Sequence, residues 1–116
     1  MKSNNLRKDR RVLDKVSFYL YYENMYKYNE DNTLVELKDY IDSTYDQHYS
    51  QNKFQATEFI IDGGHGEGFC IGNILKYAQR YGKKNGKDRK DLLKVIHYGI
   101  IALHVNDMEK RDNEIK

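Results

Sequence analysis

The sequence predicts an all-α fold, a compact bundle of about five helices built as one domain. Apolar residues recur at helical spacing through most of the chain, and no segment alternates apolar and polar residues over more than a few positions. The chain has no proline, which removes the strongest helix breaker. With 39% hydrophobic and 33% charged residues, the 116-residue chain has enough apolar side chains for one modest core.

The first three helices are expected in the first half of the chain. One covers Val12–Tyr28, and its apolar residues lie on two sides, which is typical of a central or interfacial helix. The second covers Thr33–Tyr45 and begins with a capping box formed by its first residue and Glu36. A polar loop over Asp46–Lys53 leads to the third helix over Phe54–Asp62, where a short strand is the alternative.

Two further helices complete the predicted bundle. The fourth covers Phe69–Tyr81, with Gly82 as its C-terminal cap. Asp88 caps the fifth, which runs to Asn106. The predicted core face of the fifth helix holds Leu92, Ile96, Gly99, Ile100 and Leu103. A second stripe holds Asp91, Lys94, Tyr98, Ile101 and Val105, and its apolar far end indicates a subunit contact and hence an oligomer.

The expected organisation has three parts. Residues 1–45 are an N-terminal helical extension packed on the core, residues 46–106 are the helical core, and residues 107–116 are a charged tail that frays. The glycine-rich run Gly63–Gly68 precedes a helix, so it is either an anion-binding turn or a flexible connector.

Composition limits the classes of function. A net charge of +2 does not indicate a nucleic-acid partner. The single cysteine, Cys70, excludes an internal disulfide, fits a cytoplasmic location, and is expected in the core. No stretch approaches the roughly 20 apolar residues that span a membrane, so no membrane partner is expected. No histidine pair has the spacing of metal ligands, so we expect no metal site.

The fourth predicted helix carries a polar stripe opposite its apolar side. At 100° per residue, Asn73, Lys76, Arg80 and Lys84 lie within about 80° of one another, and Tyr77 lies at the boundary. Such a row of cations is either a solvated face or a site for phosphate oxygens, to which Arg offers a fork and Lys a point charge.

Several motifs follow one another from His48 to about Leu103. They are His48-Tyr49, the segment Phe54–Ile60, Phe69 with Gly72-Asn73-Ile74-Leu75-Lys76-Tyr77, Arg80 with Gly82-Lys83-Lys84, and Asp91-Leu92 with Lys94 and Tyr98. This half of the chain resembles a phage-associated family of small helical domains, the SaV-like domain of unknown function, which includes a small phage nucleotide kinase. Gln55 departs from the pattern, because the family usually has an acid there.

The resemblance implies a phage-type nucleotide-binding protein, most concretely a non-P-loop deoxynucleoside monophosphate kinase in the host cytoplasm. ATP or another nucleotide is the implied phosphate donor, with Mg²⁺ as an option. The implied catalytic residues are Glu58, Asp91 and Lys76. The implied binding residues are His48, Tyr49, Asn73, Lys76, Tyr77, Arg80, Lys83, Lys84 and Lys94.

Two alternatives stay open. A non-catalytic phage accessory protein would use the same basic helix to bind a host protein or to sequester a nucleotide signal. Gln55, in place of the acid that the family usually has, slightly favours this alternative. Nucleoside triphosphate pyrophosphohydrolase chemistry ranks third, because it needs several carboxylates at helical spacing, and the chain has no such cluster. The expected partners are a nucleotide and further copies of the chain.

Overall fold

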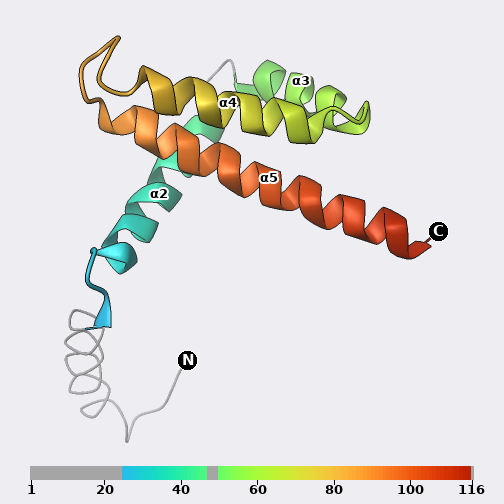
Figure 1. Cartoon of the computed structure of the whole chain (residues 1–116), viewed down its shortest axis with the longest axis horizontal. Coiled ribbons are helices and arrows are strands. Elements are labelled where there is room, and N and C mark those ends of the chain that lie inside the picture. Colours follow the sequence, from blue (N-terminus) through green and yellow to red (C-terminus); the bar gives the residue numbers. More distant parts are fainter. Residues whose placement is uncertain (1–24, 47–49, 116) are drawn as a thin grey trace, which may run out of the picture. The chain divides into compact units, whose positions relative to one another are not determined.

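The computed structural model describes residues 25–46 and 50–115, which are helical apart from turns (Figure 1). Four helices occur there: α2 (Glu30–Tyr45), α3 (Ser50–Asp62), α4 (Gly66–Arg80) and α5 (Arg89–Ile115). The predicted all-α class is therefore confirmed for these ranges. The strand alternative within Phe54–Asp62 is wrong, because α3 covers that segment.

The described residues hold fewer helices than the sequence predicts. Four are present instead of about five, and the helix predicted over Val12–Tyr28 falls mostly outside the described residues. The chain forms two compact units, Met1–Lys38 and Asp39–Lys116. The boundaries expected from the sequence, after residues 45 and 106, stay predictions.

Helix α2 begins at Glu30, before the predicted capping box at Thr33. Asn29 has a left-handed backbone with φ of 62°, and its side-chain oxygen accepts a 2.7 Å hydrogen bond from the Asn32 amide. The backbone N–H of Thr33 already donates to the Asn29 carbonyl at 3.0 Å, as in a helix interior. The capping box is therefore wrong, because Asn29 turns the chain one turn earlier and acidic Glu30 suits the positive end of the helix.

The glycine-rich run divides between a turn and a helix start. Gly64 has a φ of +88° and turns the chain after α3. Gly66 is buried as the first residue of α4, where an added Cβ would lie 3.0 Å from a Val105 methyl carbon. The second half of the run is thus the first turn of α4 and not a flexible connector.

Both predicted caps at the α4–α5 turn are confirmed. Gly82 follows the end of α4 with a φ of +86°, which a residue with a side chain rarely adopts. The Asp88 carboxylate accepts a 3.0 Å hydrogen bond from the Lys90 backbone N–H, in the first turn of α5. The helix then continues to Ile115, so the segment after Asn106 that was expected to fray is helical.

Helices α4 and α5 lie side by side and antiparallel, and α3 contacts α4 (Figure 1). Cys70 of α4 is fully buried, as expected, and burial raises the pKa of its thiol. Among the described residues, no helix has both the length and the apolar character needed to cross a membrane.

The predicted core face of α5 is wrong. The α5 residues that are buried are Asp91, Leu93, His97 and Val105, whereas Leu92, Ile96, Ile100 and Leu103 keep at least 40% of their surface exposed. The reason is that α4 packs against the stripe with Asp91, Tyr98 and Val105, where Gly66 allows close approach and Arg80 offers a counter-charge. The stripe that indicated a subunit contact is used within the chain instead.

Candidate functional site

Three cations from two helices surround the ring of Tyr77. The Lys76 and Lys94 ammonium nitrogens each lie 5.0 Å from the ring centroid, and the Arg80 guanidinium carbon lies 5.7 Å from it. We call Lys76, Arg80 and Lys94 around Tyr77 the cationic cluster. The negative face of an aromatic ring attracts cations at such distances, so Tyr77 offsets part of their mutual repulsion.

Aromatic packing between α4 and α5 holds Tyr77 in place. Its ring is nearly parallel to that of Tyr98, with centroids 6.0 Å apart and an 11° angle. Tyr98 also meets Phe69 edge to face at 5.8 Å. Burial, and then nearby Tyr77, Tyr40 and Cys70, raise the pKa of the Tyr98 hydroxyl. The hydroxyl therefore keeps its proton at neutral pH.

A buried carboxylate lies beside the cluster. The side chain of Asp91 is only 2% exposed, and one of its oxygens lies 3.6 Å from Arg80 Nε. That distance is an ion pair and not a hydrogen bond, and neither Arg80 Nε nor Asp91 Oδ2 has a hydrogen-bond partner. Asp91 thus positions the Arg80 guanidinium and supplies the cluster with one negative charge.

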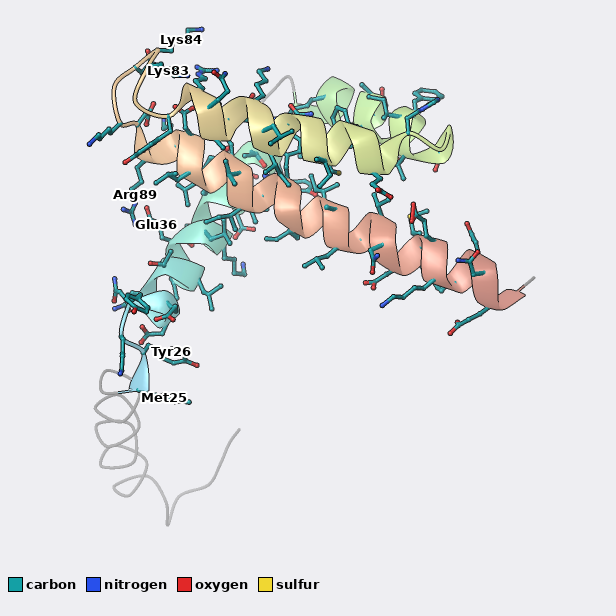
Figure 2. The ribbon with its side chains drawn as sticks, in the orientation of Figure 1. Met25, Tyr26, Glu36, Lys83, Lys84 and Arg89 are labelled. Carbon is teal, nitrogen blue, oxygen red and sulfur yellow. The ribbon has the colours of Figure 1, made fainter. Side chains whose placement is uncertain are left out.

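The remaining residues of the predicted polar stripe lie along the same helix or just after it. Asn73 donates a 2.9 Å hydrogen bond to the Phe69 carbonyl one turn earlier, which uses one of its amide hydrogens. Lys83 and Lys84 are exposed in the turn after α4, and Lys83 Nζ lies 3.5 Å from the Gln79 side-chain oxygen (Figure 2). The two lysines extend the positive charge past the helix end.

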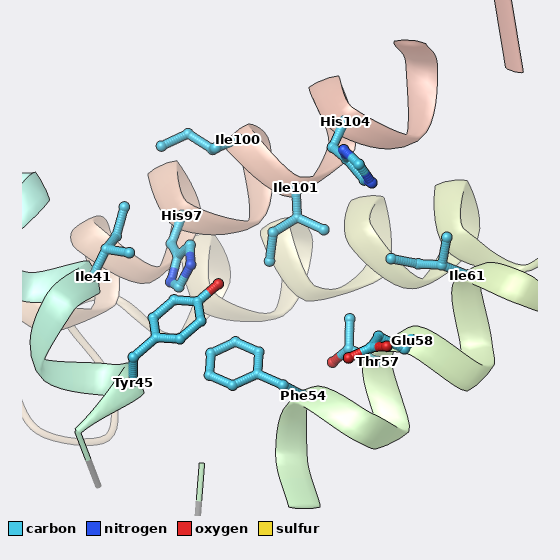
Figure 3. A pocket seen from close by; sticks show the side chains of 10 residues that line it. All are labelled: Ile41, Tyr45, Phe54, Thr57, Glu58, Ile61, His97, Ile100, Ile101 and His104. Atoms are coloured by element: carbon cyan, nitrogen blue, oxygen red, sulfur yellow. The ribbon is translucent and has the colours of Figure 1, made fainter. Parts of the chain in front are cut away.

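Glu58, the other predicted catalytic acid, lies in a different place. It lines a hollow of about 420 Å³ with mostly apolar walls (Figure 3). The lining residues are Ile41, Tyr45, Phe54, Thr57, Glu58, Ile61, His97, Ile100, Ile101 and His104. Tyr45 and Phe54 stack on one wall with ring centroids 4.3 Å apart. His104 stands roughly 20 Å along α5 from Asp91, so the hollow extends well away from the cationic cluster.

This hollow was not predicted from the sequence. Its α5 wall is formed by His97, Ile100, Ile101 and His104, whose spacing of three and four residues is the signal that could have indicated a shared face. The predicted binding residues His48 and Tyr49 lie outside the described residues.

The stability of the fold should depend on pH through His97. Its side chain is buried and meets Tyr40 edge to face at 6.1 Å. Burial, and secondarily the charge of Lys53, lower the pKa of His97 below its usual 6.5. The unfolded chain therefore binds the proton more readily, and the unfolding free energy falls as pH drops below about 6.5, until the lowered pKa is passed.

Urea unfolding of the wild type and of His97→Gln at a series of pH values from 7.5 to 5 measures this effect. We expect the wild type to lose more stability than the variant on acidification. His104→Gln is the control, because His104 is exposed on the same helix and lines the same hollow. Equal pH profiles for the wild type and His97→Gln would show that His97 does not carry the effect.

Among residues 25–46 and 50–115, no three His, Cys, Asp or Glu side chains lie close enough together to hold a metal ion. The arrangement at the cationic cluster instead suits an anion: three positive groups, one buried counter-charge and a rigid aromatic base.

Residues 43–99 match the model of a family described as a protein of unknown function (DUF3310). The matched residues include the cationic cluster, Asp91 and Tyr98. No curated protein shows significant similarity to the chain, and neither does any solved structure.

Proposed function

We propose that the chain is a phage-type nucleotide-binding protein whose cationic cluster binds the phosphates of a nucleotide. The observation that supports this most directly is the convergence of Lys76, Arg80 and Lys94 on Tyr77, with Asp91 as a buried counter-charge. Around Tyr77, Lys94 of α5 thus joins Lys76 and Arg80 of the predicted phosphate-binding stripe.

Charge balance supports a phosphate ligand. Three cations around one ring repel one another, and the ring and a single carboxylate offset this only in part. Lys76 is exposed and Lys94 and Arg80 are half-buried, so a ligand can reach all three while water is partly excluded. A phosphate group carries up to two negative charges and several acceptor oxygens, which complements such a set.

The activity that we propose for this site is phosphoryl transfer from ATP, or another nucleotide, to a deoxynucleoside monophosphate without a P-loop. Such transfer depends mainly on positioning and on neutralising charge. Lys76 and Lys94 would neutralise phosphate oxygens, Asp91 would orient Arg80, and Lys83 and Lys84 would extend the site. Any Mg²⁺ would be held largely by the phosphates themselves. The proposal includes a host-cytoplasmic location.

Incubating the protein with ATP and each deoxynucleoside monophosphate, and separating the products by anion exchange, tests the proposal. We expect a diphosphate product from at least one base, and a loss of roughly 10- to 100-fold in turnover for Lys76→Ala and for Lys94→Ala. Lys110→Ala is the matched control, because Lys110 is exposed on α5 beyond the DUF3310 match. Unchanged turnover in both cluster variants would exclude this site.

One observation favours the non-catalytic alternative. Glu58 lines the hollow, while Asp91 is buried against Arg80, so the two predicted catalytic acids do not meet at the cluster. A phage accessory protein that sequesters a nucleotide or binds a host protein needs no such pair. Calorimetry that detects nucleotide binding weakened by Lys76→Ala, together with no product from any base, would identify this alternative.

A further inference from the structure

The hollow that Glu58 lines has the size of a small-molecule site, and it contains no residue of the cationic cluster. Its volume of about 420 Å³ lies within the range of roughly 300–1,000 Å³ that such sites occupy. Its lining residues come from the end of α2, from α3 and from the middle of α5 (Figure 3). All of them lie within the unit Asp39–Lys116, so the hollow belongs to one compact part of the chain.

One wall of the hollow is aromatic. The rings of Phe54 on α3 and Tyr45 on α2 stack with centroids 4.3 Å apart and planes 15° apart. Tyr45 keeps 60% of its surface exposed, so a ligand can reach this wall from solvent. Ile61 and Ile101 add aliphatic surface. A flat ring suits such walls, because it stacks on aromatic side chains and removes apolar surface from water.

The α3 side of the hollow offers hydrogen-bond acceptors. An ionised carboxylate only accepts hydrogen bonds, and within the described part of the chain Glu58 forms no ion pair or hydrogen bond. The hydroxyl of Thr57, its neighbour in sequence, donates to the Lys53 carbonyl at 3.1 Å, which leaves its oxygen as an acceptor. A ligand that fills the hollow must therefore present a donor group to α3.

The α5 side of the hollow offers a hydrogen-bond donor. The His104 side chain points from α5 toward the hollow, and an imidazole carries at least one N–H in either charge state (Figure 3). His97 lies at the other end of the same wall, where burial lowers its pKa and keeps its ring neutral at neutral pH. The hollow therefore suits a ligand that carries a donor and an acceptor on one polar edge.

We propose that the hollow binds a planar nucleobase in which an amino group stands next to a ring nitrogen. The amino group would donate to Glu58 and Thr57, the ring nitrogen would accept from His104, and the ring would pack on the aromatic wall. Adenine and cytosine carry this pair of groups, whereas thymine has a carbonyl oxygen in place of the amino group. The choice of a nucleobase among such rings rests on the proposed function, but these contacts involve no phosphate.

Other classes of ligand fit the hollow less well. A purely apolar molecule would remove water from the Glu58 carboxylate without supplying a donor, which costs free energy. An anion would be repelled by the same carboxylate. An aliphatic ammonium ion would satisfy the carboxylate but leave the aromatic wall uncovered. An amino-substituted ring meets both requirements, because it combines a neutral donor with a flat apolar face.

Titration of 2-aminopurine riboside with the full chain, followed by the fluorescence of the base, tests the proposal. Stacking on aromatic rings quenches this emission, and the chain has no tryptophan to interfere. We expect saturable quenching, and binding roughly 10-fold weaker for Glu58→Ala and for Phe54→Leu. Adenosine should displace the probe at least about 10-fold better than purine riboside, which lacks the amino group. The probe carries no phosphate, so it should bind even if the cationic cluster holds no nucleotide.

Glu67→Ala and Phe59→Leu are the matched controls, because both residues are exposed and neither lines the hollow. Both should bind the probe like the wild type. Glu58 is exposed on α3, so Glu58→Ala should keep the helix content measured by circular dichroism and carries the test even if Phe54→Leu unfolds. No quenching at millimolar protein would overturn the proposal. Controls that weaken binding as much as the hollow variants would overturn it too, and so would equal displacement by adenosine and purine riboside.

Discussion

Replacing Arg80 with methionine is expected to lower the unfolding free energy by about 3–5 kcal/mol, because it leaves a buried charge without its partner. Asp91 is 2% exposed, and Arg80 Nε, at 3.6 Å, forms its ion pair. Methionine keeps much of the length and apolar volume of the arginine stem, so lost packing contributes little. Urea unfolding followed by circular dichroism measures the difference.

The double variant Arg80→Met with Asp91→Leu separates the cost of a stranded charge from the value of the pair. Replacing both partners with apolar residues of similar volume is often neutral or stabilising, so we expect the double variant to be more stable than Arg80→Met alone. Nucleotide binding should stay weak in both, because both lack the guanidinium. Strictly additive stability losses would show that Asp91 does not depend on Arg80. Lys76→Met, at an exposed position, is the control and should change stability by about 0.5 kcal/mol or less.

Local chemistry decided which helix boundaries could be predicted. Gly82 ends α4 and Asp88 begins α5 as expected, because a left-handed glycine and a capping carboxylate act on their own neighbours. The start of α2 was misjudged for the same kind of reason, since both Asn29 and Thr33 can cap a helix and the asparagine comes first. The all-α fold class could be predicted from the helical spacing of the apolar residues alone.

The orientation of α5 could not be predicted from its own sequence. Apolar residues lie on both the Leu92 side and the Val105 side, so the helix has two candidate core faces. The choice depends on α4, where Arg80 gives Asp91 a counter-charge and Gly66 makes room for Val105. From its sequence alone, an aspartate is expected on the surface. Its burial can be predicted only once the helix that carries its ion-pair partner is placed.

Only part of the candidate site was predictable, because the spacing along one helix shows which of its own residues share a face but not which residues another helix brings beside them. The stripe of Lys76 and Arg80 follows from the period of one helix, and the structure places Lys94 beside both through Tyr77. The position of Glu58 in the hollow depends on how α3 packs, which no spacing within α3 reveals.

Gly66→Ala is expected to destabilise the fold by about 1–3 kcal/mol, although alanine is the better helix residue. The new Cβ would lie 3.0 Å from one Val105 methyl carbon and 3.2 Å from Ile61 Cγ1, closer than ordinary contact. Val105 is buried and branched at Cβ, so it has little freedom to move aside. The first turn of α4 would therefore have to move away from α5.

Gly68→Ala provides the comparison two residues further along α4, where an added Cβ meets nothing within 4 Å. It should raise the unfolding free energy by about 0.5–1 kcal/mol, measured by urea unfolding. The same substitution thus has opposite signs at two glycines of one motif. In a Val105→Ala background the penalty of Gly66→Ala should shrink, because the methyl carbons that it meets are gone. Equal stabilisation at both glycines would show that the approach of α5 at Gly66 is not close enough to constrain the fold.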